Sequence, residues 1–159
     1  MDHKTSLTQH IAAPAEKVWA VITDIPASAA TLSGVKSIQM LTEGAYAEGT
    51  RWKETRAMMG RAETVEMWVA QSRPPSQPGG GLASTTVKAV QDGAGYTTHF
   101  ALAERDGGTD LTVTFAAELL KPTRFSKAMM AVFGPLGMRI TRRALAKDLA
   151  EIAAKAESL

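Results

Sequence analysis

The sequence predicts one α+β domain in which a curved antiparallel sheet of about seven strands packs against a long C-terminal helix. The middle of the chain, from 35 to 120, contains runs of alternating apolar and polar residues separated by turn residues. From Thr123 onward the apolar residues recur every three or four positions, which is typical of a helix. The 159 residues are 45% hydrophobic and 21% charged, so 1–159 can form one globular domain with a sizeable core.

The N-terminal part predicts a strand followed by two short helices. Apolar and polar residues alternate over 7–11, which indicates the first strand. Pro14 suits the first position of a helix, where its missing N–H is no loss. The residue before Pro26 is pushed out of helical geometry, so the first helix ends there and a second runs to Leu32.

Six further strands are expected, joined by short turns that permit only antiparallel neighbours. They cover 35–42, 50–58, 62–72, 84–91, 96–104 and 109–120. Glycine-containing turns separate most of them, and the proline- and glycine-rich stretch 74–81 is predicted to be a loop. One face of the sheet should be apolar and buried beneath a helix.

The last part of the chain is expected to supply that helix. Thr123 is a candidate N-cap because it follows Pro122 and precedes the periodic residues. Apolar residues then recur to the end of the chain at Phe125, Met129, Val132, Phe133, Leu136, Met138, Leu145, Leu149 and Ile152. Pro135 removes a helical hydrogen bond, so the helix should be kinked or interrupted near it.

Several classes of protein are disfavoured by composition. There are no cysteines, which removes disulfides and thiolate metal sites and fits a reducing compartment. No apolar run approaches the ~18 residues of a membrane span, and no secretory leader is visible at the N-terminus. We therefore expect a cytoplasmic protein, either a monomer or a homodimer.

Charge is unevenly distributed although the net charge is only +2, which is too small to indicate nucleic-acid binding. Residues 1–120 carry ten basic and thirteen acidic side chains, whereas 121–147 carries seven basic side chains and no acid. The segment 121–147 is either a solvated helix face or a surface that makes transient contact with anionic ligands or lipid membranes.

Five short motifs resemble the START/Bet v 1-like helix-grip superfamily, particularly the bacterial polyketide cyclase/dehydrase and lipid-transport group, known as SRPBCC. They are Ile11-Ala12-Ala13-Pro14-Ala15-Glu16-Lys17-Val18-Trp19, Ile22-Thr23-Asp24, Gly49-Thr50-Arg51-Trp52-Lys53-Glu54-Thr55, the stretch 69–75 with its paired prolines, and Gly108-Thr109-Asp110-Leu111-Thr112-Val113. In order, they span nearly the whole chain. The resemblance implies a hydrophobic cavity between sheet and C-terminal helix. Members of the superfamily include lipid carriers, receptors and aromatase/cyclases, so the fold alone does not fix a function.

No motif of a metal site, hydrolase triad or phosphate-binding loop is present, and no cofactor is expected. Of the three histidines, His3 lies near the terminus. His10 and His99 lie in predicted strands beside inward-pointing Ile11 and Phe100, so both should point outward.

The polar residues of most interest lie on the strand of Trp52. If Trp52 points inward, alternation turns Glu54 and Arg56 inward as well, and a carboxylate and guanidinium in an apolar cavity would orient a ligand or transfer protons. Glu66 shares a strand with Trp68 and could join them. In the alternative arrangement this face lies outward or at the cavity mouth and carries ordinary cross-strand ion pairs.

The apolar residues of the sheet and helix are the candidate ligand-binding surface. Flexible methionines suit a pocket of irregular shape, although the same residues could simply form a packed core. The candidate lining residues are Trp52, Glu54, Met67, Val69, Phe100, Leu102, Val113, Phe115, Met129 and Phe133.

Three functions remain open from the sequence. The first is binding or transport of a small hydrophobic molecule, such as a lipid or a polyketide-like ring system. The second is a cyclase or dehydratase in which Glu54 is the base and Arg56 steadies a developing enolate. The third is an accessory interaction subunit, which an exposed apolar patch around Trp68 would favour.

Overall fold

The computed structural model describes residues 3–58, 60–76, 82–120 and 133–159. Within them are seven strands: β1 (His3–Ile11), β2 (Val35–Met40), β3 (Arg51–Met58), β4 (Arg61–Arg73), β5 (Ala83–Gln91), β6 (Ala94–Arg105) and β7 (Gly108–Leu119). The helices of this part are α1 (Ala15–Thr23), the 3-10 helix η1 (Ile25–Ala27), α2 (Ser28–Thr31) and α4 (Pro135–Glu157).

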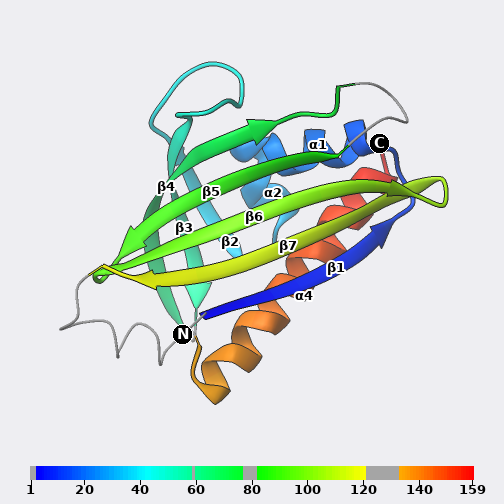
Figure 1. The fold of residues 1–159 in the computed structure, drawn as a ribbon. Helices are drawn as coiled ribbons and strands as arrows, with labels where there is room; N and C mark the ends of the chain where they lie inside the picture. The colour runs from blue at the N-terminus through cyan, green and yellow to red at the C-terminus, as the bar shows by residue number, and fades with distance from the viewer. Residues whose placement is uncertain (1–2, 59, 77–81, 121–132) are drawn as a thin grey trace.

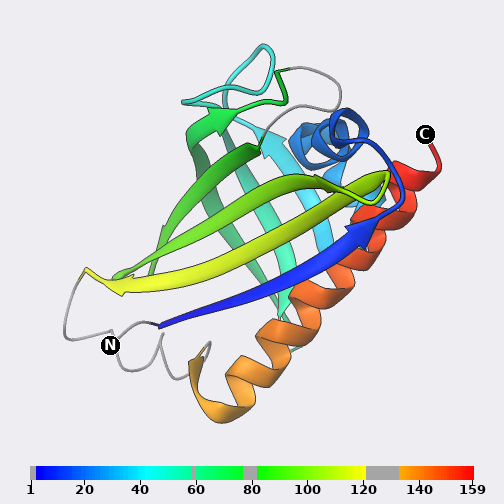
Figure 2. The same cartoon turned by 45° about the vertical axis from the view of Figure 1, so that its right-hand side comes forward.

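The strands form a single antiparallel sheet in the order β1-β7-β6-β5-β4-β3-β2. Strands β2 to β7 follow one another as a meander, and the first strand, β1, pairs with β7. The sheet curves around α4, which runs along its concave side, while α1 and α2 sit at one end (Figures 1 and 2). This arrangement confirms the predicted α+β helix-grip architecture.

β1 begins at His3, earlier than the start at residue 7 that alternation predicts. Residues His3 to Ser6 pair in register with Ala117 to Thr114 of β7. Local alternation does not reveal this extension because the pairing is with a strand more than a hundred residues away in the chain.

The described part of the long helix begins at Pro135, with Gly134 as its N-cap, in agreement with the break predicted there. Proline is well tolerated at this position because its missing N–H would lack a helical partner anyway. The predicted N-cap Thr123 lies outside the described residues.

Two clusters of buried side chains occupy the inner side of the sheet. The larger joins α1 and the C-terminal half of α4 to β1, β6 and β7, and its largest members include Ile11, Val18, Leu102, Leu111 and Ile152. The second lies over β3, β4 and β5 and consists of Ile25, Trp52, Val69 and Val87. Burial of these apolar groups is the main force that holds the helices to the sheet.

Gly108 is required by close packing at the start of β7. A Cβ atom added there would lie 2.3 Å from the carbonyl oxygen of Ile11 and 3.0 Å from Nε2 of His10. Gly108→Ala should therefore destabilise the protein by about 2 kcal/mol, since the backbone of β1 must move to admit it. Urea unfolding would measure the change.

Gly34→Ala is the matched control for that substitution. A Cβ at Gly34 would lie 3.2 Å from Nη1 of Arg56, which is the far end of a flexible side chain. Its cost should be well below that of Gly108→Ala, and equal costs at the two positions would contradict the packing argument.

Candidate functional site

The inner face of β3 carries an aromatic and two charged residues. Trp52 is 2% exposed and belongs to the second core cluster, so alternation along β3 turns Glu54 and Arg56 to the same inner side. Of the two orientations that the sequence leaves open, the structure has the inward one.

These side chains form a polar cluster with a carboxylate from α4. Arg56 donates from Nε to Oε1 of Glu54 at 2.7 Å and from Nη2 to Oδ2 of Asp148 at 2.8 Å. Trp52 donates from Nε1 to Oε2 of Glu54 at 3.2 Å. One guanidinium therefore joins β3 to the helix, and both oxygens of Glu54 are engaged.

The cluster is shielded from water, with side-chain exposures of 28% for Arg56, 12% for Glu54 and 17% for Asp148. Burial disfavours the charged form of Arg56, but the carboxylates of Asp148 and Glu54 outweigh that effect and raise its pKa. Burial also raises the pKa of Asp148, although the neighbouring guanidinium acts in the opposite direction. Asp148 thus holds a proton more readily than an exposed aspartate.

A further carboxylate lies next to this cluster. Glu63 of β4 is the direct cross-strand partner of Arg56, so it too points to the inner side. Its Oε2 accepts a hydrogen bond from Nε2 of Gln91 at 3.3 Å, and the side chain is half-buried.

Aromatic rings form a stacked column over β6 and β7 on the inner face. Tyr96 of β6 stacks on Phe115 of β7 with ring centroids 5.8 Å apart and planes 4° from parallel. Phe115 in turn stacks on Phe133, just before α4, at 5.8 Å and 11°. His3 of β1 contacts Phe133 at 5.7 Å in a tilted arrangement. We call the three stacked rings of Tyr96, Phe115 and Phe133 the aromatic column.

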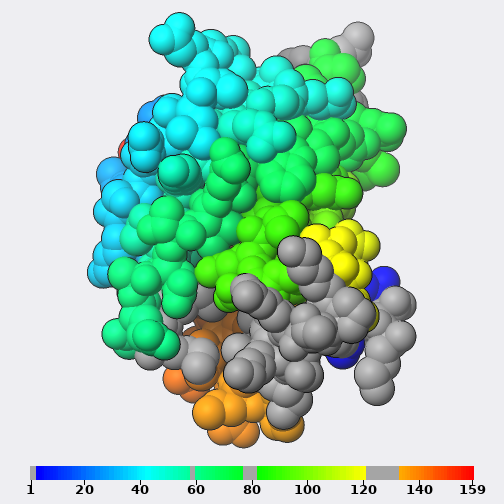
Figure 3. All heavy atoms as spheres, turned by 90° about the vertical axis from the view of Figure 1, so that its left-hand side faces the viewer, coloured from blue at the N-terminus to red at the C-terminus, as the bar shows by residue number. Residues whose placement is uncertain are grey.

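The inner side chains at this end of the sheet remain partly accessible to water. Tyr96, Phe100 and Phe115 are only half-buried, whereas Leu102 and Val113 are almost completely buried. Figure 3 shows the surface hollowed between the green strands of the β3–β4 hairpin and the orange beginning of α4. Partly exposed aromatic side chains on the inside of a curved sheet are the environment that an apolar ligand requires.

Of the predicted lining residues, Glu54 belongs to the polar cluster, and the apolar ones divide into two groups. Trp52, Val69, Leu102 and Val113 are buried core residues. Met67, Phe100, Phe115 and Phe133 are half-buried, and the last two belong to the aromatic column. Met129 lies outside the described residues.

Glu66 does not join the inner cluster, which corrects one expectation. It pairs with Lys53 on the outer side of the sheet and is exposed. Trp68 lies on that side too, with the guanidinium carbon of Arg51 5.1 Å from its ring centroid. Trp68 and Trp52 are thus on opposite faces, because residues 52 and 67, not 52 and 68, are opposite each other in the register.

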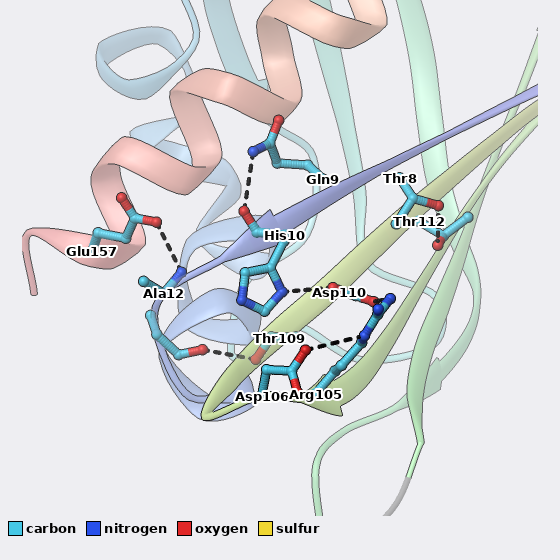
Figure 4. Close-up of polar contacts among 11 residues, drawn as sticks. Thr8, Gln9, His10, Ala12, Arg105, Asp106, Thr109, Asp110, Thr112 and Glu157 are labelled. Atoms are coloured by element: carbon cyan, nitrogen blue, oxygen red, sulfur yellow. Dashed lines mark hydrogen bonds and ion pairs between the residues drawn. The ribbon is translucent and has the colours of Figure 1, made fainter.

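His10 and His99 point outward as alternation predicts. Figure 4 shows the imidazole of His10 directed at Asp110 of the neighbouring strand, with Nδ1 and Oδ1 2.7 Å apart. This hydrogen bond, with help from Arg105, lowers the pKa of Asp110. Nδ1 of His99 lies 2.8 Å from the hydroxyl of Thr86. His3, in contrast, is part of β1 and contacts the aromatic column.

Sequence reasoning missed Asp148, Glu63 and Tyr96. One signal for Asp148 was present, because it is the first acidic residue after the basic stretch that ends at Lys147. Alternation carried a signal for the other two, because Tyr96 has the same parity as inward-pointing Phe100 and Glu63 the same parity as Met67.

The basic residues of α4 lie largely on its outer surface. Arg139, Arg142, Arg143 and Lys147 are exposed, and Arg142 also donates to the hydroxyl of Thr5 on the inner side of β1. In the part of the chain that the structure describes, no helix is long and apolar enough to cross a membrane.

A curved antiparallel sheet that grips a C-terminal helix, with polar and aromatic groups on its inner face, defines a helix-grip protein of the START/Bet v 1 type. The chain belongs to the family described as polyketide cyclase/dehydrase and lipid transport, whose family model matches residues 2–157. No curated protein matches the chain in sequence.

Solved structures with the same fold cover nearly the whole chain. The Zhui aromatase/cyclase from Streptomyces sp. R1128 has a TM-score of 0.75 and 16% identity, with 99% of this chain and 94% of that chain covered. A START superfamily protein from Mycobacterium smegmatis has a TM-score of 0.65 and 17% identity, with 98% and 95% covered. Ara h 8.0201 has a TM-score of 0.69 and 14% identity, with 100% of both chains covered. At these identities the likeness concerns the fold alone.

Proposed function

We propose that this protein binds or carries a small hydrophobic molecule, such as a lipid or a polyketide-like ring system, on the inner face of the sheet. The observation that carries the proposal is the half-buried aromatic column of Tyr96, Phe115 and Phe133 on the same inner face as a shielded polar cluster. Apolar surface supplies affinity and a few fixed polar groups supply orientation. We place this activity in the cytoplasm.

The expected affinity follows from the area that a ligand would bury. A two-ring aromatic molecule that loses roughly 200 Å² of apolar surface gains about 5 kcal/mol before association costs. Offset stacking on Tyr96, an end ring of the aromatic column, adds about 1 kcal/mol. Such a ligand would bind reversibly, as a carrier requires, once the loss of translational freedom is subtracted.

Native mass spectrometry of the purified protein, followed by extraction and identification of the released compound, tests the proposal. We expect an apolar compound at near one molecule per chain. Phe115→Ala should lower its occupancy because it removes the middle ring of the aromatic column. The control Thr114→Ala alters the adjacent residue on the outer face, where Thr114 bonds to Ser6, and should retain the compound.

Empty protein that also fails to bind a neutral apolar dye such as Nile red would contradict the binding function. Equal loss of the compound in Phe115→Ala and Thr114→Ala would contradict the assignment of the inner face as the binding surface.

An enzymatic function of the cyclase or dehydratase type is the second candidate, and one observation favours it. Asp148 is a shielded carboxyl with a raised pKa, as an acid–base residue needs, and among the described residues only its Oδ2 is engaged. Glu54 suits the role of base less well, because both its oxygens already accept hydrogen bonds. Conversion of the extracted compound that is lost in Asp148→Asn while binding persists would favour this candidate.

The role of an accessory subunit receives no support from the surface around Trp68. The ring is covered by Arg51 and lies opposite Lys88 in the register, so its surroundings are charged. The exposed basic side chains Arg139, Arg143 and Lys147 of α4 would instead suit transient contact with an anionic membrane during delivery of a ligand.

A further inference from the structure

The arginine of the polar cluster has little capacity left to bind an anion. Its Nε and Nη2 groups donate to Glu54 and Asp148, and Nη1 faces Gly34, where an added Cβ would be 3.2 Å away. Two carboxylates surround one guanidinium, so the cluster carries a net negative charge when both are ionised. A ligand carboxylate placed there would meet excess negative charge.

The unused hydrogen-bonding capacity beside this cluster is of the acceptor type. Glu63 uses Oε2 to accept from Gln91, and its Oε1 has no partner among the described residues. Within the same part of the chain, Asp148 likewise uses only Oδ2. A carboxylate oxygen can accept from a ligand N–H or O–H group but cannot donate.

One of these acceptors, Glu63, is two diagonal steps from the aromatic column across the inner face. Gln91, which bonds to Glu63, is the next inner residue of β5 after Ala89, and Ala89 is the direct cross-strand partner of Tyr96. Diagonal neighbours on one face of a sheet are about 7–8 Å apart. Gln91 therefore lies between Tyr96 and Glu63, and a planar molecule stacked at Tyr96 can extend a polar substituent past Gln91 toward Glu63.

We infer that the inner site selects planar aromatic molecules that carry a cationic or hydrogen-bond-donating substituent, and disfavours those that carry a carboxylate. The inference rests on the proposed binding function and assigns its ligand class. Stacking holds the ring, and Glu63 with the excess charge of the Glu54–Arg56–Asp148 cluster holds the substituent.

One basic group on the opposite wall could favour the reverse selectivity. Arg142 of α4 reaches Thr5 on the inner side of β1, and an anionic ligand would use it. Arg142 is exposed to solvent, however, so water and salt screen its charge more than they screen the cluster.

Three probes with the same ring system distinguish these cases: 2-naphthylmethylamine, which is a cation at pH 7, neutral 2-naphthylmethanol, and 2-naphthoate. Isothermal titration calorimetry at low salt should show the amine binding about tenfold more tightly than the naphthoate, with the alcohol between them. Added salt should reduce the ratio.

Two variants, each of which removes one negative charge, test whether Glu63 causes the preference for the amine. Glu63→Gln should reduce the amine-to-naphthoate ratio at least threefold, while the carboxamide oxygen of the new side chain can still accept the hydrogen bond from Gln91. Glu66→Gln removes the same charge from the outer face and should leave the ratio unchanged.

Naphthoate binding as tight as that of the amine would overturn the inference, and so would an equal effect of the two variants. Binding of all three probes with equal affinity would leave the proposed function standing and refute the selectivity. Failure of every probe to bind would contradict the proposed function itself.

Discussion

Arg56→Met should destabilise the protein by about 3 kcal/mol at pH 7. The substitution keeps an apolar side chain of similar length but leaves Glu54 and Asp148 without their shared cation. Removal of one partner from a shielded ion pair is costly because the remaining charges lose their compensation while staying out of water. Guanidinium unfolding followed by circular dichroism would measure the loss.

The cost should depend on pH. Burial already raises the pKa of Asp148, and loss of the guanidinium, which now lowers that pKa, would raise it further. When the pKa of a carboxyl is higher in the folded than in the unfolded protein, the folded protein loses stability as pH rises toward that pKa. The difference between Arg56→Met and the natural protein should therefore be largest near pH 7 and shrink toward pH 4.

Arg51→Met is the matched control for Arg56→Met. Arg51 lies on the same strand but on the outer face, where it contacts Trp68 and is exposed, so its loss should cost less than about 1 kcal/mol. The double variant Glu54→Gln, Arg56→Met should recover part of the loss. Equal costs for Arg51→Met and Arg56→Met, or no pH dependence, would contradict the role assigned to the cluster.

The fold was predictable because its signals are local. Strand alternation, turn glycines and the change of period after 120 each depend on residues close together in sequence. The start of β1 was harder to predict, because its first residues are held by pairing with β7 and do not show a strand pattern of their own.

The site was only partly predictable, since alternation fixes which residues share a face but not which face is buried. Trp52 lies between Arg51 and Lys53 and Trp68 between Met67 and Val69, and the register places the two rings on opposite sides. The second partner of Arg56, Asp148, could not be predicted for another reason. It is 92 residues away, on a helix whose rotation about its axis the sequence does not specify closely.

Arg56 therefore affects both the stability of the fold and the charge preference of the inner site, two properties that the sequence does not connect. Arg56 donates hydrogen bonds to both Glu54 and Asp148, so it holds α4 against β3. For the same reason it has little capacity left to bind an anionic ligand. Stability and ligand charge preference should thus respond together to changes in this cluster, whereas changes at Glu63 should affect ligand preference alone.

Trp52→Ala should have a larger effect still, a loss of about 4 kcal/mol. The side chain is 2% exposed and packs with Ile25, Val69 and Val87, so its removal leaves a cavity in the second core cluster. It also removes the indole N–H that donates to Oε2 of Glu54. Guanidinium unfolding would measure the loss.

Trp68→Ala provides the comparison, because it removes the same side chain from the outer face of the adjacent strand. There the ring is half-buried and contacts the flexible side chain of Arg51, so the loss should be about 1 kcal/mol or less. A larger cost for Trp68→Ala than for Trp52→Ala would mean that the sheet buries the opposite face of β3 and β4. In that case Glu54 and Arg56 would lie in solvent, and neither the polar cluster nor the ligand selectivity inferred from it could stand.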